Sequence, residues 1–132
     1  FADARALLAS LRYRGFQTAV VTNTLFPAGL FARRLAALGL AGYIDALACS
    51  ADLGLAKPDA APYRAALDAL GSGAGEALFV GDRVDTDIAG ARAAGVEAVR
   101  IDRTRASPDF AAGVVHRLTA LGRWLGEGPV PP

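Results

Sequence analysis

The chain has 132 residues, the length of one domain, and its 14 basic and 13 acidic residues leave a formal net charge of +1. This balance argues against strongly electrostatic binding to nucleic acid or to an anionic membrane. The 53% hydrophobic content is rich in alanine, and no run approaches the ~18 apolar residues that span a bilayer. The single Cys49 excludes an internal disulfide and a multi-cysteine zinc site, and it fits a reducing compartment such as the cytoplasm.

Two residue types are nearly or wholly absent. The chain contains no Met and begins at Phe1, so we expect it to be part of a longer translation product. Lys57 is the only lysine, and every other basic residue is an arginine. Because lysine is so rare in this chain, its presence at position 57 suggests a specific role.

Hydrophobic periodicity predicts alternating helices and strands along the chain. Helices are expected over residues 3–14, 27–38, 59–70, 87–94 and 113–125, and strands over 18–22, 43–49, 77–81 and 98–101. Short strands joined by helices of this length indicate βαβ units and a parallel sheet covered on both faces. We expect one domain over residues 1–125 and a flexible tail over residues 126–132.

Polar residues follow the predicted strands at the points where a parallel α/β sheet binds its ligands. The first strand ends in Thr22 and Asn23, and the third is followed by Asp82 and Asp87. Lys57 comes after the second strand and opens a helix. A hydroxyl, an ammonium and carboxylates suit a phosphate beside a divalent cation, because the first two bind phosphate oxygens and carboxylates hold Mg²⁺.

Each of these residues also has a purely structural interpretation. Thr22 and Asn23 fit a strand that turns into a loop, Lys57 fits a solvated helix start, and Asp87 fits a helix N-cap. Asp82 is harder to explain in this way, since a carboxylate after a buried strand is costly unless it binds something. The functional interpretation depends on all of them occurring in this order.

Three segments resemble the second, third and fourth motifs of the haloacid dehalogenase (HAD) superfamily. They are Val20–Asn23, Lys57–Asp59 and Val80–Asp87, and their flanks, Leu11–Phe16 and Ala89–Val96, look like the phosphoglycolate phosphatase-like members. The resemblance covers residues 3 to 103. It implies a three-layer Rossmann-like α/β fold, with a parallel sheet between two layers of helices.

The resemblance also implies a role for each motif residue. Thr22 would donate its hydroxyl to the transferring phosphoryl group, with Asn23 beside it. Lys57 would stabilise negative charge on that group and on the attacking carboxylate. Asp82 would bind Mg²⁺, directly or through water, and Asp87 would support the site from the same loop. The implied activity is Mg²⁺-dependent hydrolysis of a small phosphorylated metabolite, with neither nucleic acid nor membrane as a partner.

The first motif of the family, an Asp-x-Asp at the end of a strand, has no counterpart before Thr22. The only upstream aspartate is Asp3, in a predicted helix, and Asp85-Thr86-Asp87 has the spacing but follows the wrong strand. The first Asp of that motif forms an aspartyl-phosphate and the second is the acid/base. We therefore expect the chain alone to be inactive. Any large cap would lie upstream, because too few residues separate Thr22 from Lys57.

The missing motif also removes a strand. In the family this strand lies mid-sheet, between the strands that end at Asn23 and at Asp82. Without it, two strand edges are left unpaired. We expect the gap to be filled by upstream residues, filled by another chain through self-association or strand exchange, or closed by direct pairing of 18–22 with 77–81. A non-catalytic binding or regulatory module that kept this fold is the alternative function.

Overall fold

The computed structural model describes residues 2–104 and 108–126, and helices and strands alternate along most of the chain. The helices are α1 (Ala2–Tyr13), α2 (Ala28–Ala37), α3 (Ser50–Leu53), α4 (Ala60–Leu70), α5 (Ala89–Ala93) and α6 (Gly122–Leu125). The strands are β1 (Ala19–Thr22), β2 (Ala46–Cys49), β3 (Leu78–Gly81), β4 (Glu97–Ile101) and β5 (Val114–Val115).

Local chemistry explains the bounds of the helix that follows the third motif. Helix α4 begins after Asp59, whose side chain accepts a hydrogen bond from the main-chain N–H of Ala61 at 2.8 Å. It ends at Gly71, whose φ of +64° is the left-handed conformation typical of a residue that follows a helix. The loop after β3 forms a π-helical turn, Val84–Ile88, before α5 begins.

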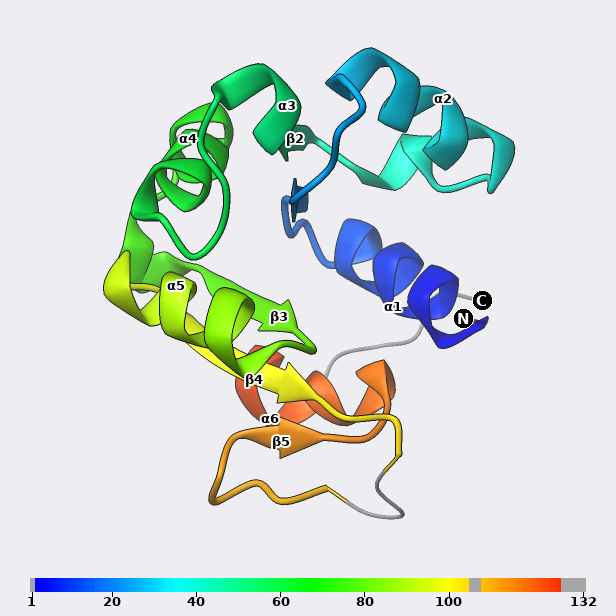
Figure 1. Cartoon of the computed structure of the whole chain (residues 1–132). Coiled ribbons are helices and arrows are strands. Elements are labelled where there is room, and N and C mark those ends of the chain that lie inside the picture. The colour runs from blue at the N-terminus through cyan, green and yellow to red at the C-terminus, as the bar shows by residue number, and fades with distance from the viewer. Residues whose placement is uncertain (1, 105–107, 127–132) are drawn as a thin grey trace.

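The strands form two separate parallel sheets. β1 pairs with β2, and β3, β4 and β5 form the second sheet (Figure 1). Within the described ranges β1 and β3 are not hydrogen-bonded to each other, and every residue of both strands is only half-buried. The sequence leaves three possibilities for the gap. The third, direct pairing of 18–22 with 77–81, is therefore wrong. Each of the two strands thus has one edge that no other described strand pairs with.

The second sheet is covered on both faces, which confirms the predicted three layers. Neighbouring residues of β4 point to opposite faces, as in any strand. Ala98 packs in a cluster with Tyr63 of α4 and Ala91 of α5. Val99 packs on the other side with Val115, against residues of α1 and α6.

Helix α1 bridges the two sheets on one side of the molecule (Figure 1). Near its end, Arg12 donates to the Asp45 carboxylate at 3.0 Å and to the Gly42 carbonyl at 2.6 Å, beside β2. Near its start, Asp3 accepts two hydrogen bonds from Arg103, after β4, and one from the main-chain N–H of Leu118. The two ends of one helix are thus tied to different sheets.

Helix α4 is the second bridge. It packs against β1 and β2, and it also contacts α5 of the other half. Its Tyr63 hydroxyl donates to the main-chain carbonyl of Thr86 at 2.7 Å, in the loop after β3. Within the described residues, α1 and α4 therefore connect the two sheets.

The predicted helix over 113–125 is wrong. The structure has β5, a 3₁₀ turn (Leu118–Leu121) and the short α6 in this region. Gly113 has a φ of +66°, which turns the chain, and the β-branched pair Val114 and Val115 then aligns with Arg100 and Ile101 of β4. Most of the predicted tail, residues 127–132, lies outside the described residues.

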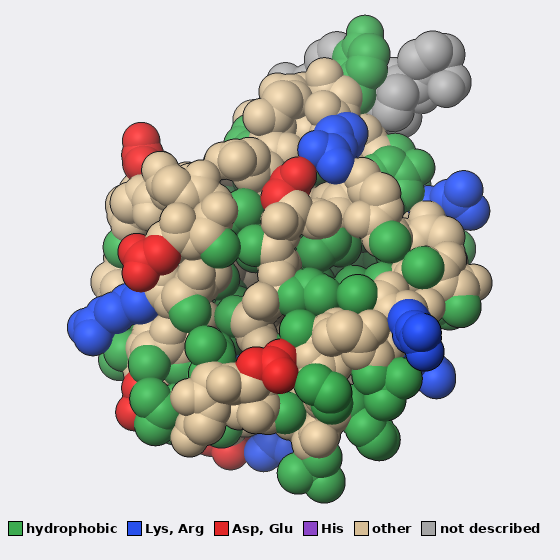
Figure 2. Space-filling view, turned by 90° about the horizontal axis from the view of Figure 1, so that it is seen from above, with side chains coloured by type: hydrophobic (Ala, Val, Ile, Leu, Met, Phe, Trp, Pro, Cys, Tyr) green, Lys and Arg blue, Asp and Glu red, His purple; other side chains and the backbone are tan. Residues whose placement is uncertain are grey.

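The surface is apolar around the loops that follow β1 and β2. Figure 2 shows hydrophobic side chains gathered around a hollow on the face seen from above. The large exposed hydrophobic residues of these loops and of α2 and α3 are Leu25, Phe26, Leu30, Leu53 and Leu55. Over the described ranges no helix has the length and apolarity needed to cross a bilayer.

Candidate phosphoryl-binding site

Thr22 and Asp82 mark the ends of two strands on either side of the gap. Thr22 is the last residue of β1, and its hydroxyl makes no hydrogen bond with the described part of the chain. Asp82 directly follows β3, and its side chain is exposed and makes no hydrogen bond or ion pair there. A donor and an acceptor are thus left open for a ligand.

Asn23 and Lys57 are joined through the side-chain amide of Asn23. The Asn23 Oδ1 accepts a hydrogen bond from the main-chain N–H of Lys57 at 2.8 Å. The Asn23 Nδ2 donates to the main-chain carbonyl of Lys57 at 2.9 Å. The second and third motifs, far apart in sequence, are therefore in direct contact.

Lys57 and Asp87 form a buried ion pair. The Lys57 Nζ lies 2.6 Å from the Asp87 Oδ1, and their side chains are only 12% and 6% exposed. The ammonium also lies 5.7 Å from the centroid of the Phe79 ring, on β3. Lys57 follows β2 of the first sheet, and Asp87 lies in the loop after β3 of the second sheet, so this ion pair connects the two sheets.

The Asp87 carboxylate is fully engaged within the protein. Its Oδ2 accepts from the main-chain N–H groups of Asp82 and Arg83, both at 3.1 Å. Burial by itself would raise the pKa of Asp87, but the hydrogen bonds from Lys57 and from the loop outweigh it and hold that pKa below its ordinary value. Asp87 is thus an anion that fixes both the loop and Lys57.

Gly81 allows Asp87 to take this position. A Cβ at Gly81 would lie 2.4 to 2.6 Å from the side-chain atoms of Asp87, closer than any such contact in a real protein. The last residue of β3 must therefore lack a side chain for the carboxylate to reach the main chain of its own loop.

Tyr63 is a site component that sequence reasoning missed. Its hydroxyl donates to the main-chain carbonyls of Thr86, at 2.7 Å, and Asp87, at 3.2 Å. Burial, with the Asp87 charge as a second cause, raises the pKa of Tyr63 to about 12 and keeps the donor proton in place. The available signal was an aromatic residue on the buried face of the helix that Lys57 precedes.

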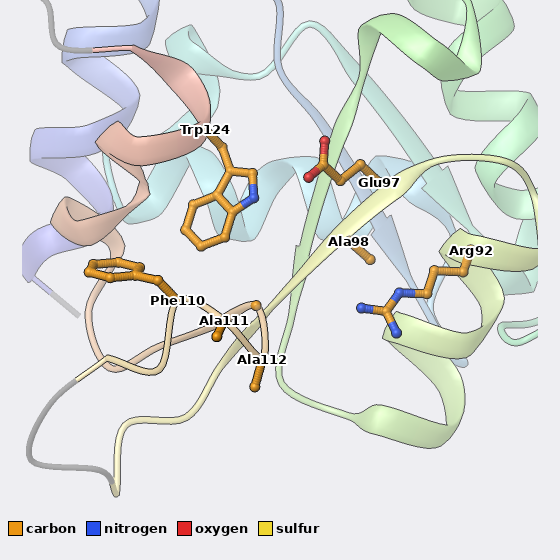
Figure 3. A pocket seen from close by; sticks show the side chains of 8 residues that line it. Arg92, Glu97, Ala98, Phe110, Ala111, Ala112 and Trp124 are labelled. Atoms are coloured by element: carbon orange, nitrogen blue, oxygen red, sulfur yellow. The ribbon is translucent and has the colours of Figure 1, made fainter.

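The remaining candidate residues lie apart from this cluster. Asp85 forms an exposed ion pair with Arg83 at 3.2 Å. Among the described residues, no group of three or more His, Cys, Asp or Glu side chains is arranged to hold a metal ion. A separate pocket of about 250 Å³ lies at the start of β4, between Arg92, Glu97 and Trp124 (Figure 3). None of the candidate site residues lines this pocket.

The resemblance expected from the motifs is confirmed by comparison with known proteins. A family-wide sequence profile described as "haloacid dehalogenase-like hydrolase" matches residues 1–95. A phosphoglycolate phosphatase of Rhodospirillum rubrum is 41% identical over 130 residues, which are 96% of this chain and 53% of that protein. A phosphoserine phosphatase of Thermus thermophilus is 39% identical over 119 residues, 86% of this chain and 47% of that protein.

Solved structures agree with the sequence relatives. The crystal structure of a HAD phosphatase from Thermococcus onnurineus superimposes with a TM-score of 0.82 at 28% identity, over 96% of this chain and 58% of that one. The chain spans about half the length of the curated relatives it matches. With most of its length covered by the family profile, the chain belongs to the haloacid dehalogenase-like hydrolases and is of the phosphatase type.

Proposed function

We propose that this domain binds the phosphoryl group and the Mg²⁺ ion of an enzyme that hydrolyses a small phosphate monoester. The observation that carries the proposal is the unbroken series of contacts from Asn23 through Lys57 and Asp87 to the main chain of Asp82. This series joins three motifs across a gap between two sheets. At the strand ends, the Thr22 hydroxyl and the Asp82 carboxylate make no hydrogen bond with the described residues.

Hydrogen-bond donors for phosphate come from the first sheet and its loops. The Thr22 hydroxyl is unused within the described residues. Asn23 uses one of its two Nδ2 hydrogens on Lys57, so the other is left for a phosphoryl oxygen. The Lys57 ammonium adds positive charge in a largely buried place, where its attraction to a phosphoryl group is stronger than in water.

Carboxylates for Mg²⁺ come from the loop after β3. Asp82 is exposed and offers a hard oxygen ligand, which fits an ion that prefers carboxylates and waters. Asp87 supports this ligand by holding the main-chain N–H of Asp82. Mg²⁺ would neutralise negative charge on the phosphoryl oxygens. One free carboxylate does not make a complete site, so its other ligands would come from outside the described residues.

The nucleophile would also come from outside this chain. In the proposed reaction an upstream Asp carboxylate attacks phosphorus, the bond from phosphorus to the ester oxygen breaks, and an acid protonates the leaving alkoxide. Water then hydrolyses the aspartyl-phosphate. The 132 residues alone are expected to bind phosphate without turning a substrate over.

The substrate is proposed to be a small phosphorylated metabolite. Both curated relatives named above are phosphatases of such compounds, by their names phosphoglycolate and phosphoserine. The site provides groups for the phosphoryl end only. Specificity for the rest of the molecule would therefore depend on a covering element outside this chain.

Activity after restoration of the first motif tests the proposal. The chain would be joined to an upstream segment that ends in an Asp-x-Asp strand, and assayed with p-nitrophenyl phosphate and Mg²⁺. Lys57→Ala and Asp82→Ala should each lower kcat/KM by about 10²-fold or more. Asp85→Ala, in the same loop, serves as the matched control and should retain activity. Absence of activity in the joined protein would favour a non-catalytic binding module.

The unpaired edges of β1 and β3 suggest how the lacking strand is supplied. We infer that upstream residues or a second copy of the chain fill this place, since unpaired edges promote pairing with another strand. Light scattering as a function of concentration tests the second route. A chain that stays monomeric, and becomes more stable when the upstream strand is attached, would support the first route instead.

A further inference from the structure

The amide of Asn23 clamps the main chain of Lys57 from both sides of its Cα. One amide group accepts from the Lys57 N–H at 2.8 Å and donates to the Lys57 carbonyl at 2.9 Å. A carboxamide offers an acceptor and a donor side by side, as this arrangement requires. Asn23 is the only asparagine in the chain.

The position of the Lys57 ammonium depends on how the base of its side chain is held. The ammonium sits at the end of a four-carbon chain whose immobilisation costs up to ~2 kcal/mol of conformational entropy. Within the described residues, the two hydrogen bonds with Asn23 are the only ones that join Lys57 to β1 or to the residue directly after it. The main chain beside Lys57 continues into Pro58, which has no N–H with which to add another.

We propose that Asn23 is a positioning residue for Lys57. By holding both polar groups of the Lys57 main chain to the end of β1, it places the Nζ against Asp87 and Phe79 before any phosphate arrives. The use of that ammonium for phosphate rests on the proposed function. The positioning of Lys57 by Asn23 does not rest on the proposed function, so an experiment can contradict either hypothesis without the other.

The single lysine makes the test specific. An amine-acylating ester applied to the folded 132-residue chain at neutral pH can modify only Lys57 and the terminal amine, and mass spectrometry separates the two. In the native chain Lys57 is 12% exposed and paired with Asp87, so its acylation should be slow relative to the terminal amine. Asn23→Ala should speed acylation of Lys57 about tenfold, because two hydrogen bonds of ordinary strength are lost.

Two further variants separate positioning from loss of structure. Asn23→Leu keeps the approximate shape of the side chain while it removes both polar groups, and it should match Asn23→Ala. Asp59→Ala removes the N-cap of α4 two residues after Lys57 without touching the clamp, and it should leave the Lys57 rate near the native value. All rates would be compared under conditions where circular dichroism shows the variants folded.

The outcomes distinguish the two hypotheses. Equal Lys57 rates in the native chain and in both Asn23 variants, or an equal increase in Asp59→Ala, would overturn the positioning role. Inorganic phosphate with Mg²⁺ should slow Lys57 acylation in the native chain and do so less in Asn23→Leu. If phosphate gives no protection while the Asn23 variants still expose Lys57, the clamp stands and the phosphoryl-binding proposal fails.

Discussion

Lys57 Nζ and Asp87 Oδ1, 2.6 Å apart, form an ion pair between two halves of the molecule whose described strands do not pair with each other. Lys57 follows the β1–β2 sheet, and Asp87 belongs to the loop after β3. Two oppositely charged groups are buried together here, with main-chain N–H groups satisfying the second carboxylate oxygen. The residues proposed for phosphoryl binding therefore also hold the fold together.

Removal of one partner of this pair should destabilise the chain strongly. Lys57→Met keeps most of the side chain but leaves a buried carboxylate without its cation, so we expect the free energy of unfolding to fall by about 3 kcal/mol. Asp87→Leu should cost a similar amount. The double variant should cost less than the sum, since neither charge is then left alone. Urea unfolding measures all three, and strict additivity would argue against the pair.

Loss of the Tyr63 hydroxyl should loosen the Asp87 loop. Tyr63→Phe keeps the ring against Phe79 but leaves the carbonyls of Thr86 and Asp87 without this donor. We expect a loss of about 1–2 kcal/mol of stability, measured by urea unfolding. Tyr13→Phe, at an exposed position of α1, is the matched control. Equal stability of the two variants would contradict the bridging role of Tyr63.

Gly90 should not tolerate a methyl group. A Cβ at this position would lie 2.6 Å from the Tyr63 hydroxyl and 2.9 Å from the Cα of Pro58. Gly90→Ala must move α5 away from α4, and we expect it to cost about 1–3 kcal/mol. Gly29→Ala, in α2, meets nothing within 4 Å and should be neutral or stabilising, by at most ~1 kcal/mol. Thermal unfolding of both variants gives the comparison.

Asp3 should make the stability of the chain depend on pH in the acid range. Hydrogen bonds, first from Arg103 and then from the main-chain N–H of Leu118, hold the pKa of Asp3 below its usual 3.8. A lowered carboxyl pKa contributes stability that is present above about pH 4 and is lost as the pH falls through the folded-state value. Asp3→Asn should therefore be less stable than the native chain at pH 7, with a difference that shrinks at pH 3.

Urea unfolding at both values of pH measures this difference. Asp68→Asn, at an exposed position of α4, is the control for removal of a carboxylate. A destabilisation by Asp3→Asn that is the same at pH 3 and pH 7 would show that its charge does not connect α1 to the second sheet.

Cys49 should report the opening of the first sheet. It is 1% exposed at the end of β2, and burial, with Asp52 as a second cause, raises the pKa of its thiol. Iodoacetamide should alkylate Cys49 only in molecules that open, at a rate that rises with urea. Destabilising variants such as Lys57→Met should speed the reaction. Rapid alkylation of the folded native chain would place Cys49 at the surface and contradict this packing.

Sequence periodicity predicted the longer helices and the strands up to β4, because most of them have a clear apolar face or core. It did not predict α3, and the helix expected from Asp87 begins as the π-helical turn Val84–Ile88. It failed after Gly113, where the residues that look helical are divided among a two-residue strand and short turns. The pairing of Val114 and Val115 with β4 depends on tertiary contacts, which the local hydrophobic pattern does not reveal.

The motif residues identified the site, but not the interactions within it. That Lys57 and Asp87 lie near each other follows from the resemblance. The hydrogen bonds from Asn23 to Lys57 and from Tyr63 to Thr86 end on main-chain groups. Every residue has such groups, so the amino-acid sequence does not indicate which of them will be bonded. These contacts became visible only with the fold.

The attachment of α1 to both sheets has a mechanical consequence. Asp3 and Arg12 are tied to different halves of the molecule and lie ~13 Å apart along the axis of one rigid helix. The helix therefore fixes the distance between the two halves on its side of the molecule, while α4 and the Lys57–Asp87 pair hold them together elsewhere. A strand added from outside would therefore join two halves whose spacing is already fixed.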